Sequence, residues 1–377
     1  MKSFGKTGIK VILNWFNMNL SVEEKEQYSR HLLLEDIGVE GQLKLKQAKI
    51  LVIGAGGLGC PILQYLSAAG VGTIGIIDDD IVDQSNLQRQ VLFTHQDLGK
   101  SKAESAVQRL QSLNPYITFK TYKTRLTKDN ALDLFKDYEI IVDGTDNFPT
   151  RYLISDAAVL TNKPVVFGSI FKFDGQVSVF NYQNGPTYRC LFPSPPLPNE
   201  VPNCSEIGVL GVLPGIIGSL QAAETLKIVL NLGDILTGKL LTFSALTMKQ
   251  MILSFERNTS ISITSLEDDY QELCGIPNVS NEISFQEYKE QTVHFNLLDV
   301  RTQSERNDFH INGMHIPLDE LSERLREIPQ DKKLLVYCKS GVRSKLAIDF
   351  LQKNGFENTL VNLKGGYSSG YSNLRKH

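Results

Sequence analysis

Short apolar runs alternate with longer amphipathic stretches through the first half of the chain. The runs are continuous, as expected for strands of a parallel sheet that is buried on both faces. The expected strands cover residues 49–54, 73–78, 139–143 and 164–169, and the expected helices cover residues 58–69, 100–113 and 150–160. Because strands and helices alternate, the pattern predicts an α/β domain with a doubly wound parallel sheet.

The pattern changes beyond residue 175. Residues 176–182 alternate between apolar and polar, which is typical of a strand with one solvated face. Residues 209–232 form the most apolar long stretch, but Gln221, Glu224 and Lys227 interrupt it, which favours a buried helix over a membrane span. Five prolines between Phe192 and Pro202 predict an extended, mobile crossing. We therefore expect no membrane partner.

A second, smaller α/β pattern occupies the carboxy-terminal part of the chain. It has expected strands at 295–299 and 334–338 and an expected helix at 344–354. The domain organisation that we expect is an extension at 1–19, a large domain at 20–257, a polar linker at 258–280 and a small domain at 281–377. The extension is interpreted as dispensable, and the sequence leaves open whether Met1 or Met18 is the native start.

Composition limits the functional classes. The 377 residues suffice for two domains, and 41% are apolar and 21% charged, with a net charge of −3. The chain has no excess of basic residues that would indicate a nucleic-acid partner. The five scattered cysteines do not resemble a disulfide framework, so we expect a cytoplasmic protein.

The first strand leads into the loop Gly54-x-Gly56-x-x-Gly59, which opens a helix. Backbone N–H groups at such a Rossmann-like turn face a phosphate. Asp78 ends the next strand, where an acid can accept hydrogen bonds from ribose hydroxyls. At this point an NAD- or FAD-dependent oxidoreductase fits equally well.

The residues that follow favour phosphate chemistry. Asn86, Arg89 and Lys102 add a donor and two cations, which redox chemistry does not need but which stabilise charge developing at an α-phosphate. Asp146 ends another strand and could hold the Mg²⁺ of ATP. The alternative for Asp146 is a helix N-cap.

Several motifs now point to one family. They are Gly54–Cys60 (GAGGLGC), Ser85–Gln90 (SNLQRQ), Thr145-Asp146-Asn147 and Gly218–Ala222 (GSLQA). In this order they resemble the adenylyltransferases that activate ubiquitin-like sulfur carrier proteins for molybdopterin and thiamine synthesis (the HesA/MoeB/ThiF family), which are relatives of the ubiquitin-activating enzymes. The resemblance covers about residues 20–255.

The resemblance implies the residues that bind ATP. They are Gly54, Gly56, Gly57, Gly59, Asp78, Ser85, Asn86, Leu87, Gln88, Arg89, Lys102, Asp146 and Asn147. It also implies that Arg30, Arg89 and Lys102 act in catalysis, with Arg30 inserted into the site of a neighbouring protomer. A homodimer is therefore expected. Without the resemblance, Arg30 would read equally well as a solvated helix residue.

The cysteines allow further expectations. Cys204 follows the proline-rich crossing and matches the family's loop nucleophile, with a free surface thiol as the alternative. Cys60 is expected in the core. The family commonly holds zinc through two Cys-x-x-Cys pairs, but only Cys190 and Cys274 remain at these positions, so we expect no structural zinc.

The carboxy-terminal region, about residues 281–377, resembles a rhodanese domain. The resemblance rests on residues 297–301 (LLDVR), 310–317 (HINGMHIP) and 337–343 (YCKSGVR). It implies a persulfide loop made of Cys338, Lys339, Ser340, Gly341, Val342 and Arg343. Inward-facing N–H groups of such a loop stabilise a thiolate or persulfide. Tyrosine phosphatases have a loop longer by one residue, so the spacing favours sulfur over phosphate.

Two smaller expectations concern residues beside this loop. Lys339 and Arg343 are expected to assist a persulfide electrostatically. Asp299 and Arg301 are expected to fix the architecture of the domain rather than to act chemically.

Together the two domains predict one reaction sequence. The large domain would use ATP-Mg²⁺ to adenylate the C-terminal glycine of a carrier protein that ends in Gly-Gly. The small domain would supply sulfur from Cys338, loaded by an upstream cysteine desulfurase, to form a thiocarboxylate. The alternatives are the oxidoreductase, an enzyme that adenylates a modified tRNA base, and a non-enzymatic binding module. Molybdopterin, thiamine and tRNA thiolation all remain open as the receiving pathway.

Overall fold

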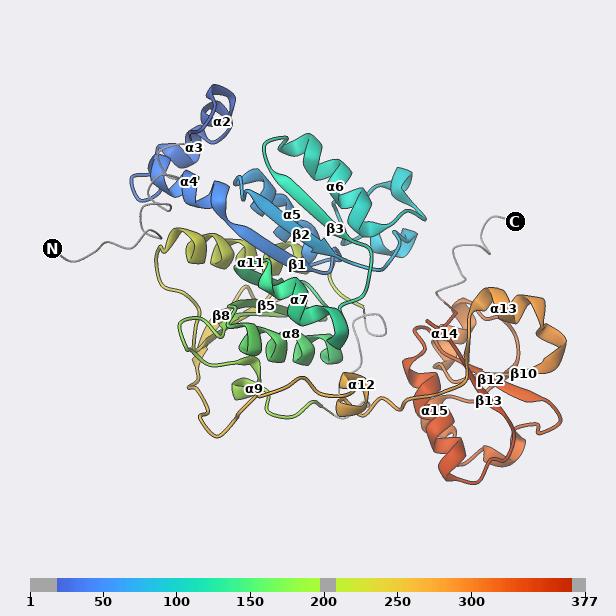
Figure 1. The fold of residues 1–377 in the computed structure, drawn as a ribbon. Helices are drawn as coiled ribbons and strands as arrows, with labels where there is room; N and C mark the ends of the chain where they lie inside the picture. Colours follow the sequence, from blue (N-terminus) through green and yellow to red (C-terminus); the bar gives the residue numbers. More distant parts are fainter. Residues whose placement is uncertain (1–18, 197–207, 368–377) are drawn as a thin grey trace. The chain divides into compact units, whose positions relative to one another are not determined.

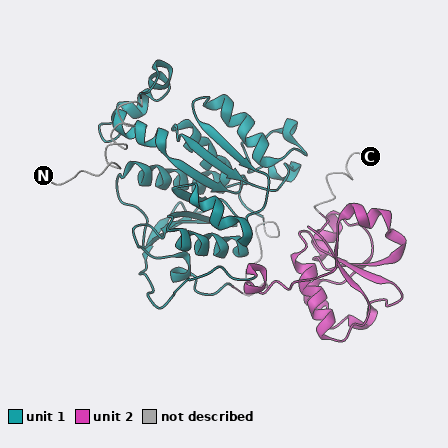
Figure 2. Cartoon of the chain, in the orientation of Figure 1, with its two compact units in different colours: residues 1–195, 201–268 teal, residues 196–200, 269–377 magenta. Residues whose placement is uncertain are grey.

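The computed structural model describes residues 19–196 and 208–367 (Figure 1). Contacts divide the chain into two compact units (Figure 2). Unit 1 comprises residues 1–195 and 201–268, and unit 2 comprises residues 196–200 and 269–377. Met18 and Cys204 lie outside the described residues.

Unit 1 begins with three short helices that precede the sheet. They are α2 (Val22–Gln27), α3 (Ser29–Leu32) and α4 (Gly38–Gln47). The first helix starts at a capping box, because the Ser21 hydroxyl accepts from the N–H of Glu24 while the Glu24 carboxylate accepts from the N–H of Ser21.

The sheet of unit 1 has the strand order β3-β2-β1-β4-β5-β6-β7-β8. The parallel strands are β1 (Lys49–Ile53), β2 (Thr73–Ile77), β3 (Thr118–Tyr122), β4 (Ile140–Asp143) and β5 (Val165–Phe171). The strands that continue it antiparallel are β6 (Asp174–Phe180), β7 (Lys239–Ser244) and β8 (Gln250–Ser254). This confirms the expected α/β fold.

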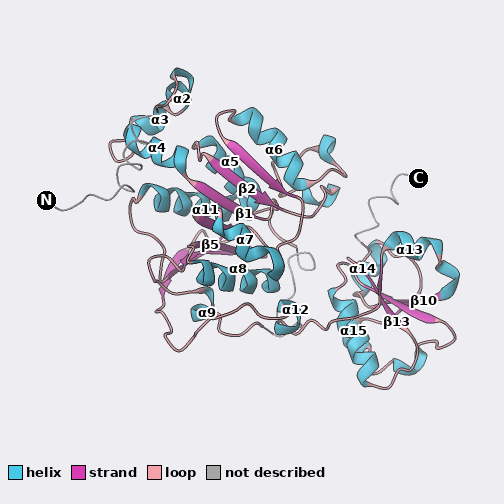
Figure 3. Ribbon diagram, in the orientation of Figure 1, coloured by secondary structure: helices cyan, strands magenta, loops and turns pink. Residues whose placement is uncertain are grey.

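Helices flank the sheet of unit 1 (Figure 3). They are α5 (Gly59–Ala68), α6 (Lys102–Leu113), α7 (Lys128–Lys136), α8 (Phe148–Thr161), α9 (Tyr188–Leu191) and α11 (Leu213–Leu230), with 3₁₀ turns η1 (Gln84–Asn86) and η2 (His95–Asp97). Helix α5 packs on α6 and α11, while α7 packs on α8. Among the described residues, α11 has the length and composition of a membrane span, yet it contacts α5, β5 and β6 and half of it is buried.

Unit 2 contains a separate parallel sheet in the order β11-β10-β12-β13-β9. Its strands are β9 (Glu282–Ile283), β10 (Phe295–Asp299), β11 (Met314–His315), β12 (Lys333–Tyr337) and β13 (Leu360–Leu363). Its helices are α12 (Tyr270–Leu273), α13 (Phe285–Glu290), α14 (Gln303–Asp308) and α15 (Val342–Lys353), with 3₁₀ turns η3 (Thr292–His294), η4 (Leu318–Glu320) and η5 (Leu325–Glu327).

A buried ion pair lies within unit 2. Arg301 donates from Nε and Nη2 to the Asp299 carboxylate at 2.9 and 2.7 Å, and neither side chain is exposed. The Tyr337 hydroxyl donates to the same carboxylate at 2.9 Å. Because removing one partner would leave a buried charge unpaired, this pair fits the architectural role expected for it.

Candidate functional site

An open cavity lies at the carboxyl ends of the parallel strands of unit 1. Its lining includes Gly54, Gly56, Gly57, Asp78, Arg89, Lys102, Asp146 and Asn147. Ligands of doubly wound sheets bind where the strand order reverses, and here the reversal falls between β1 and β4. Residues from several separate segments of the chain therefore meet at one place.

The glycine loop is shaped by close backbone contacts. Gly54 has φ +91°, and a Cβ there would lie 2.9 Å from the carbonyl oxygen of Gly144. A Cβ on Gly59 would lie 2.0 Å from the carbonyl oxygen of Gly54. This close approach requires a glycine at position 59 for the turn. Gly59 is outside the cavity lining, whereas Gly56 and Gly57 are part of it.

Asp78 connects the glycine loop to the end of β2. Its carboxylate accepts from the N–H of Ala55 and from the N–H of Asp80, each at 2.8 Å. Burial raises the pKa of Asp78, and the nearby Lys102 opposes that rise. The carboxylate therefore has a fixed position on the cavity wall, and its ribose contact stays a prediction.

Lys102 begins α6 and is almost fully buried. Its Nζ lies 2.8 Å from the Asp80 carboxylate. Burial acts to lower the pKa of Lys102, but Asp80 and Asp78 outweigh it and raise that pKa. The side chain consequently remains a cation at the cavity. Sequence reasoning missed Asp80, which the run of three aspartates at residues 78–80 could have indicated.

Arg89 reaches the cavity from the segment that follows η1. Its Nη1 donates to the carbonyl oxygen of Ser85 at 3.0 Å, and the Asn86 side chain accepts from the N–H of Asp83 at 3.2 Å. Ser85, Asn86, Leu87 and Gln88 lie outside the cavity lining. Their contacts shape the segment that carries Arg89, and their roles in binding ATP remain predictions.

The loop between β4 and α8 carries Asp146 and Asn147. The side-chain Oδ1 of Asn147 accepts from the N–H of Thr150 at 3.0 Å and from its hydroxyl at 2.7 Å, so Asn147 is the N-cap of α8. The alternative in which Asp146 caps this helix is therefore wrong. Asp146 instead lies on the cavity wall.

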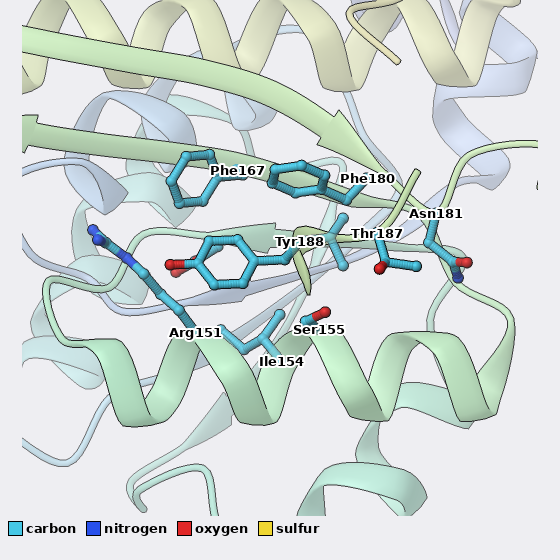
Figure 4. Close-up of a pocket in the computed structure, with 10 residues that line it drawn as sticks. Arg151, Ile154, Ser155, Phe167, Phe180, Asn181, Thr187 and Tyr188 are labelled. Carbon is cyan, nitrogen blue, oxygen red and sulfur yellow. The ribbon is translucent and has the colours of Figure 1, made fainter. Parts of the chain in front are cut away.

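The buried side chains of Asp143 and Arg151 hold that loop in place. The Asp143 carboxylate accepts from the N–H and the hydroxyl of Thr145 at 2.9 and 2.6 Å. Arg151 donates from Nη2 to the carbonyl oxygen of Thr145 at 3.0 Å, and its guanidinium lies 5.4 Å from the centre of the Phe167 ring. Figure 4 shows Arg151 extending from α8 beside Phe167. Thr145 is thus held from both sides next to Asp146.

A glutamine from α11 completes this support. Gln221 is fully buried and donates from Nε2 to the carbonyl oxygens of Asp143 and Val166 at 2.7 and 3.2 Å. A Cβ on Gly218 would lie 2.5 Å from the carbonyl oxygen of Leu58, so the helix packs closely on the start of α5. These contacts give the GSLQA motif a physical reason.

Some lining residues escaped sequence reasoning. Thr124, Arg125 and Leu126 follow β3, Ile170 lies in β5, and Val209 lies in the segment before α11. Strand β3 itself was missed, because its residues are mostly exposed and form no apolar run. The β-branched and aromatic residues of Thr118–Tyr122 are a sequence signal that could have indicated this strand and the loop after it.

The outcomes differ for three further residues that the sequence analysis singled out. Arg30 is exposed on α3, outside the lining of the cavity of its own chain. Cys204 is not among the described residues. Cys60 is fully buried, and burial raises its pKa to about 12, which confirms the expected core position.

The two remaining zinc-pair cysteines belong to different units. Cys190 in unit 1 accepts from the N–H groups of Thr187 and Asn258, each at 3.3 Å, and Cys274 is buried in unit 2. Within residues 19–196 and 208–367, no three His, Cys, Asp or Glu side chains are grouped as a metal site. The zinc expectation remains a prediction.

Cys338 lies in a second candidate site, at the carboxyl end of β12. Its side chain is fully buried, and the N–H of Gly341 donates to Sγ at 3.1 Å. Gly341 has φ +91° and is the N-cap of α15, so Lys339, Ser340, Gly341 and Val342 carry the chain from strand to helix in a tight loop. The helix N-terminus faces the sulfur.

Arg343 is occupied by another partner. It donates from both terminal nitrogens to the Glu305 carboxylate at 2.7 and 2.8 Å. Burial alone would raise the pKa of Glu305, but the bonds from Arg343 and Thr302 lower it to about 2. This bidentate pair joins the loop to α14. The expectation that Arg343 assists a persulfide electrostatically stays a prediction.

Comparison with known proteins decides the family. The ThiF family model matches residues 28–262, and the model of the Rhodanese-like domain matches residues 284–373. The chain belongs to the ThiF family. Its carboxy-terminal unit is a rhodanese-like domain.

Relatives of known name support this assignment of the ThiF-family chain. The probable adenylyltransferase/sulfurtransferase MoeZ of Mycobacterium tuberculosis is 45% identical over 369 residues, covering 92% of this chain and 93% of the relative. The sulfur carrier protein adenylyltransferase of Thermus thermophilus is 49% identical over 270 residues, covering 69% of this chain and all of the relative.

A solved structure supports the fold of unit 1. The E. coli MccB structure with MccA-N7isoASN aligns with a TM-score of 0.57 at 21% identity, covering 70% of this chain and 83% of that one. At this identity the likeness concerns the fold alone. It agrees with an α/β fold built on a large, mostly parallel sheet.

Proposed function

We propose that this ThiF-family chain is an adenylyltransferase/sulfurtransferase. It uses ATP to activate the C-terminal glycine of a ubiquitin-like sulfur carrier protein and then delivers sulfur from a persulfide on Cys338. The observation that carries this proposal is one cavity in which the glycine loop, Asp78, Arg89, Lys102 and Asp146 meet. The relatives named adenylyltransferase/sulfurtransferase and sulfur carrier protein adenylyltransferase support it.

The lining suits the parts of ATP. The N–H groups of the glycine loop face phosphate oxygens. Asp78 accepts from the ribose hydroxyls, while Arg89 and Lys102 lie against the negatively charged triphosphate. Asp146 supplies a carboxylate for Mg²⁺, which proteins commonly hold through one or two carboxylates together with substrate phosphates. When bound, that ion adds charge stabilisation to the phosphates.

The first reaction needs positioning more than acid–base chemistry. The carrier's carboxylate is already ionised and attacks the α-phosphorus; the bond to the β-phosphate oxygen breaks and pyrophosphate leaves with its electron pair. Negative charge develops on the phosphate oxygens during this step. Lys102 and Arg89 stabilise it, because a buried cation interacts more strongly than one in water.

The second reaction uses the Cys338 loop. The terminal sulfur of a Cys338 persulfide attacks the acyl-adenylate, AMP leaves, and an acyl disulfide joins the carrier to Cys338. We assign the next step to Cys204: its thiolate attacks Sγ of Cys338, and the carrier leaves as a thiocarboxylate. An external thiol then reduces the Cys204–Cys338 disulfide.

The assembly and setting of the enzyme are part of this proposal. We infer a cytoplasmic homodimer in which Arg30, exposed on α3, enters the partner's cavity, and a cysteine desulfurase that loads Cys338. Five scattered cysteines support a reducing compartment. A carrier protein rather than a tRNA base is the favoured substrate, because the chain has a net charge of −3 and a fused sulfurtransferase domain.

ATP–pyrophosphate exchange tests the first half. The purified chain should incorporate labelled pyrophosphate into ATP when a carrier ending in Gly-Gly is present, and a carrier without its last glycine is the matched control. Carriers from the molybdopterin, thiamine and tRNA-thiolation pathways should be compared, because the one with the highest exchange rate identifies the pathway. Exchange with none of them would defeat the proposal.

A further inference from the structure

A chain of buried polar groups leads away from the Cys338 sulfur. Sγ lies 3.5 Å from the Ser344 hydroxyl, and that hydroxyl lies 2.6 Å from Oδ1 of Asn362. Nδ2 of Asn362 donates to the Glu282 carboxylate at 2.7 Å. Cys338, Ser344 and Asn362 are all fully buried.

Asn362 is an unusual residue type for the interior of a fully buried strand. It lies in β13, where every residue is buried and its neighbours along the strand are Val361 and Leu363. A buried side-chain amide is costly unless its hydrogen bonds are satisfied. Here both ends of the amide are satisfied, by Ser344 and by Glu282. The packing of the sheet does not require such a residue, so its chemistry calls for an explanation.

Glu282 determines which group donates and which accepts in this series of hydrogen bonds. A carboxylate can only accept, so the NH₂ group of Asn362 must face Glu282 and its carbonyl oxygen must face Ser344. The Ser344 hydroxyl has one proton, and its acceptors are Oδ1 of Asn362 at 2.6 Å and the carbonyl oxygen of Gly341 at 3.1 Å. That proton is therefore directed away from Cys338. The lone pairs of the Ser344 oxygen face the sulfur and accept from its S–H.

A thiolate at Cys338 changes this arrangement. When the thiol gives its proton to water, Sγ becomes an acceptor, and the hydroxyl of Ser344 can turn its proton toward the sulfur without moving any heavier atom. A charged acceptor forms a stronger hydrogen bond than a neutral carbonyl. Asn362 competes for the same proton.

We propose that Ser344 and Asn362 are positioning residues for Cys338. The hydroxyl of Ser344 stabilises the sulfur anion, and Asn362 limits that stabilisation by holding the hydroxyl proton in the thiol state. This inference rests on the proposed sulfur transfer and adds the residues that govern its nucleophile.

The charges around Cys338 do not replace this control. Arg343 is paired with Glu305, Lys345 with Glu282, and Arg301 with Asp299. Tyr337 at the end of β12, Lys339 in the loop, and Lys364 and Tyr367 after β13 are further ionisable groups on the described segments next to Cys338. The variants below keep all of them.

The test is the pH dependence of the Cys338 thiolate in the full chain. Thiolate ultraviolet absorbance is followed against pH, and the spectrum of Cys338→Ser is subtracted. Ser344→Ala removes a donor to the anion, so the midpoint should rise by about one pH unit. Asn362→Leu frees the hydroxyl proton, so the midpoint should fall, and by less because the Gly341 carbonyl still competes.

The double variant Ser344→Ala/Asn362→Leu makes the test specific. Its midpoint should match that of Ser344→Ala, because Asn362 acts only through the hydroxyl. Asn296→Leu makes the same substitution in β10, where Asn296 pairs with Asp331, and should leave the midpoint unchanged. A general loosening of the unit would instead shift both asparagine variants alike.

Named results overturn the inference. Unchanged midpoints in both single variants, or shifts in the same direction, would contradict it. Sulfur transfer from thiosulfate to cyanide is measured in parallel on the unaltered chain. If that transfer is absent while the midpoints shift as expected, the role proposed for Cys338 fails and the control by Ser344 stands.

Discussion

The cavity at the glycine loop of unit 1 and the Cys338 loop of unit 2 occupy equivalent places in two different sheets. Both lie at the carboxyl ends of parallel strands, where side chains and N–H groups converge. The cavity is assembled from segments between Ile53 and Val209, whereas the loop runs from Cys338 to Arg343. One site thus depends on the whole domain, and the other mainly on one turn.

The two sites also treat charge differently. The cavity exposes charged groups, including Lys102, Arg89 and Asp146, to the space that a ligand fills. The Cys338 sulfur is fully buried and is contacted by Ser344 and by the N–H of Gly341. We interpret the first as a site that stabilises charge on a bound substrate and the second as one that controls a single nucleophile of the protein.

The largest expected effect separates the two sites completely. Cys338→Ser should abolish thiocarboxylate formation while leaving ATP–pyrophosphate exchange unchanged, because the sulfur is absent from the first reaction. Both activities are measured on the same preparation. Cys190→Ser is the control and should retain both; thiocarboxylate formation by Cys338→Ser would show that another group carries the sulfur.

Lys102→Met should impair the first reaction, the adenylation measured by ATP–pyrophosphate exchange. Without the cation, Asp78 and Asp80 remain beside the triphosphate, and the exchange rate should fall by roughly 10²–10³-fold. Sulfur transfer from thiosulfate should be unaffected. The control is Lys100→Met, since Lys100 is exposed and precedes the helix. Equal losses in the two variants, or a normal exchange rate in Lys102→Met, would remove Lys102 from the mechanism.

A smaller effect is expected from the buried support of the cavity. Arg151→Met removes the bond to the Thr145 carbonyl, so the loop that carries Asp146 should loosen, with a roughly tenfold higher Mg²⁺ requirement for exchange. Magnesium titrations of the exchange rate measure this. Lys136→Met, at an exposed position of α7, is the control. An unchanged magnesium curve in a folded Arg151→Met protein would contradict the assigned support.

The smallest expected effect concerns acid stability of unit 2. Because Glu305 has a pKa of about 2 instead of the ordinary 4.5, its pairing with Arg343 stabilises the fold above about pH 4.5, and this stability is lost as the pH falls toward about 2. Glu305→Gln should be less stable at neutral pH and should lose less stability over that range.

Urea unfolding of the full chain at neutral pH and within that acidic range measures the difference. Glu357→Gln, an exposed substitution in the same unit, is the control. If Glu305→Gln lost as much stability on acidification as the unaltered chain, the carboxylate pair would not be the cause.

The sequence predicted most of the elements that have a local pattern of apolar residues or glycines. Continuous apolar runs indicated β1, β2, β4 and β5, and the glycine spacing indicated the turn before α5. Strand β3 has no such run, because most of its residues are exposed at the sheet edge. The wall that follows it, including Arg125, was missed for the same reason.

Long-range partners could not be predicted from spacing. Lys102 pairs with Asp80, Arg343 with Glu305, and Gln221 with the Asp143 carbonyl oxygen. Each partner is at least 22 residues away along the chain, so only the fold brings them together. The cap of α8 could not be assigned from the motif either, because both Asp146 and Asn147 are capping residue types and only the folded geometry selects Asn147.

The central claim is that both sites act in turn on one carrier protein. The most direct measurement is the intact mass of a carrier ending in Gly-Gly after incubation with the full chain, ATP, Mg²⁺, thiosulfate and a thiol reductant. The account predicts that one oxygen of the carrier's terminal carboxylate is replaced by sulfur, and that omitting ATP or substituting Cys338 prevents the change. A carrier that leaves the complete reaction with its mass unaltered, although pyrophosphate exchange proceeds, would contradict it.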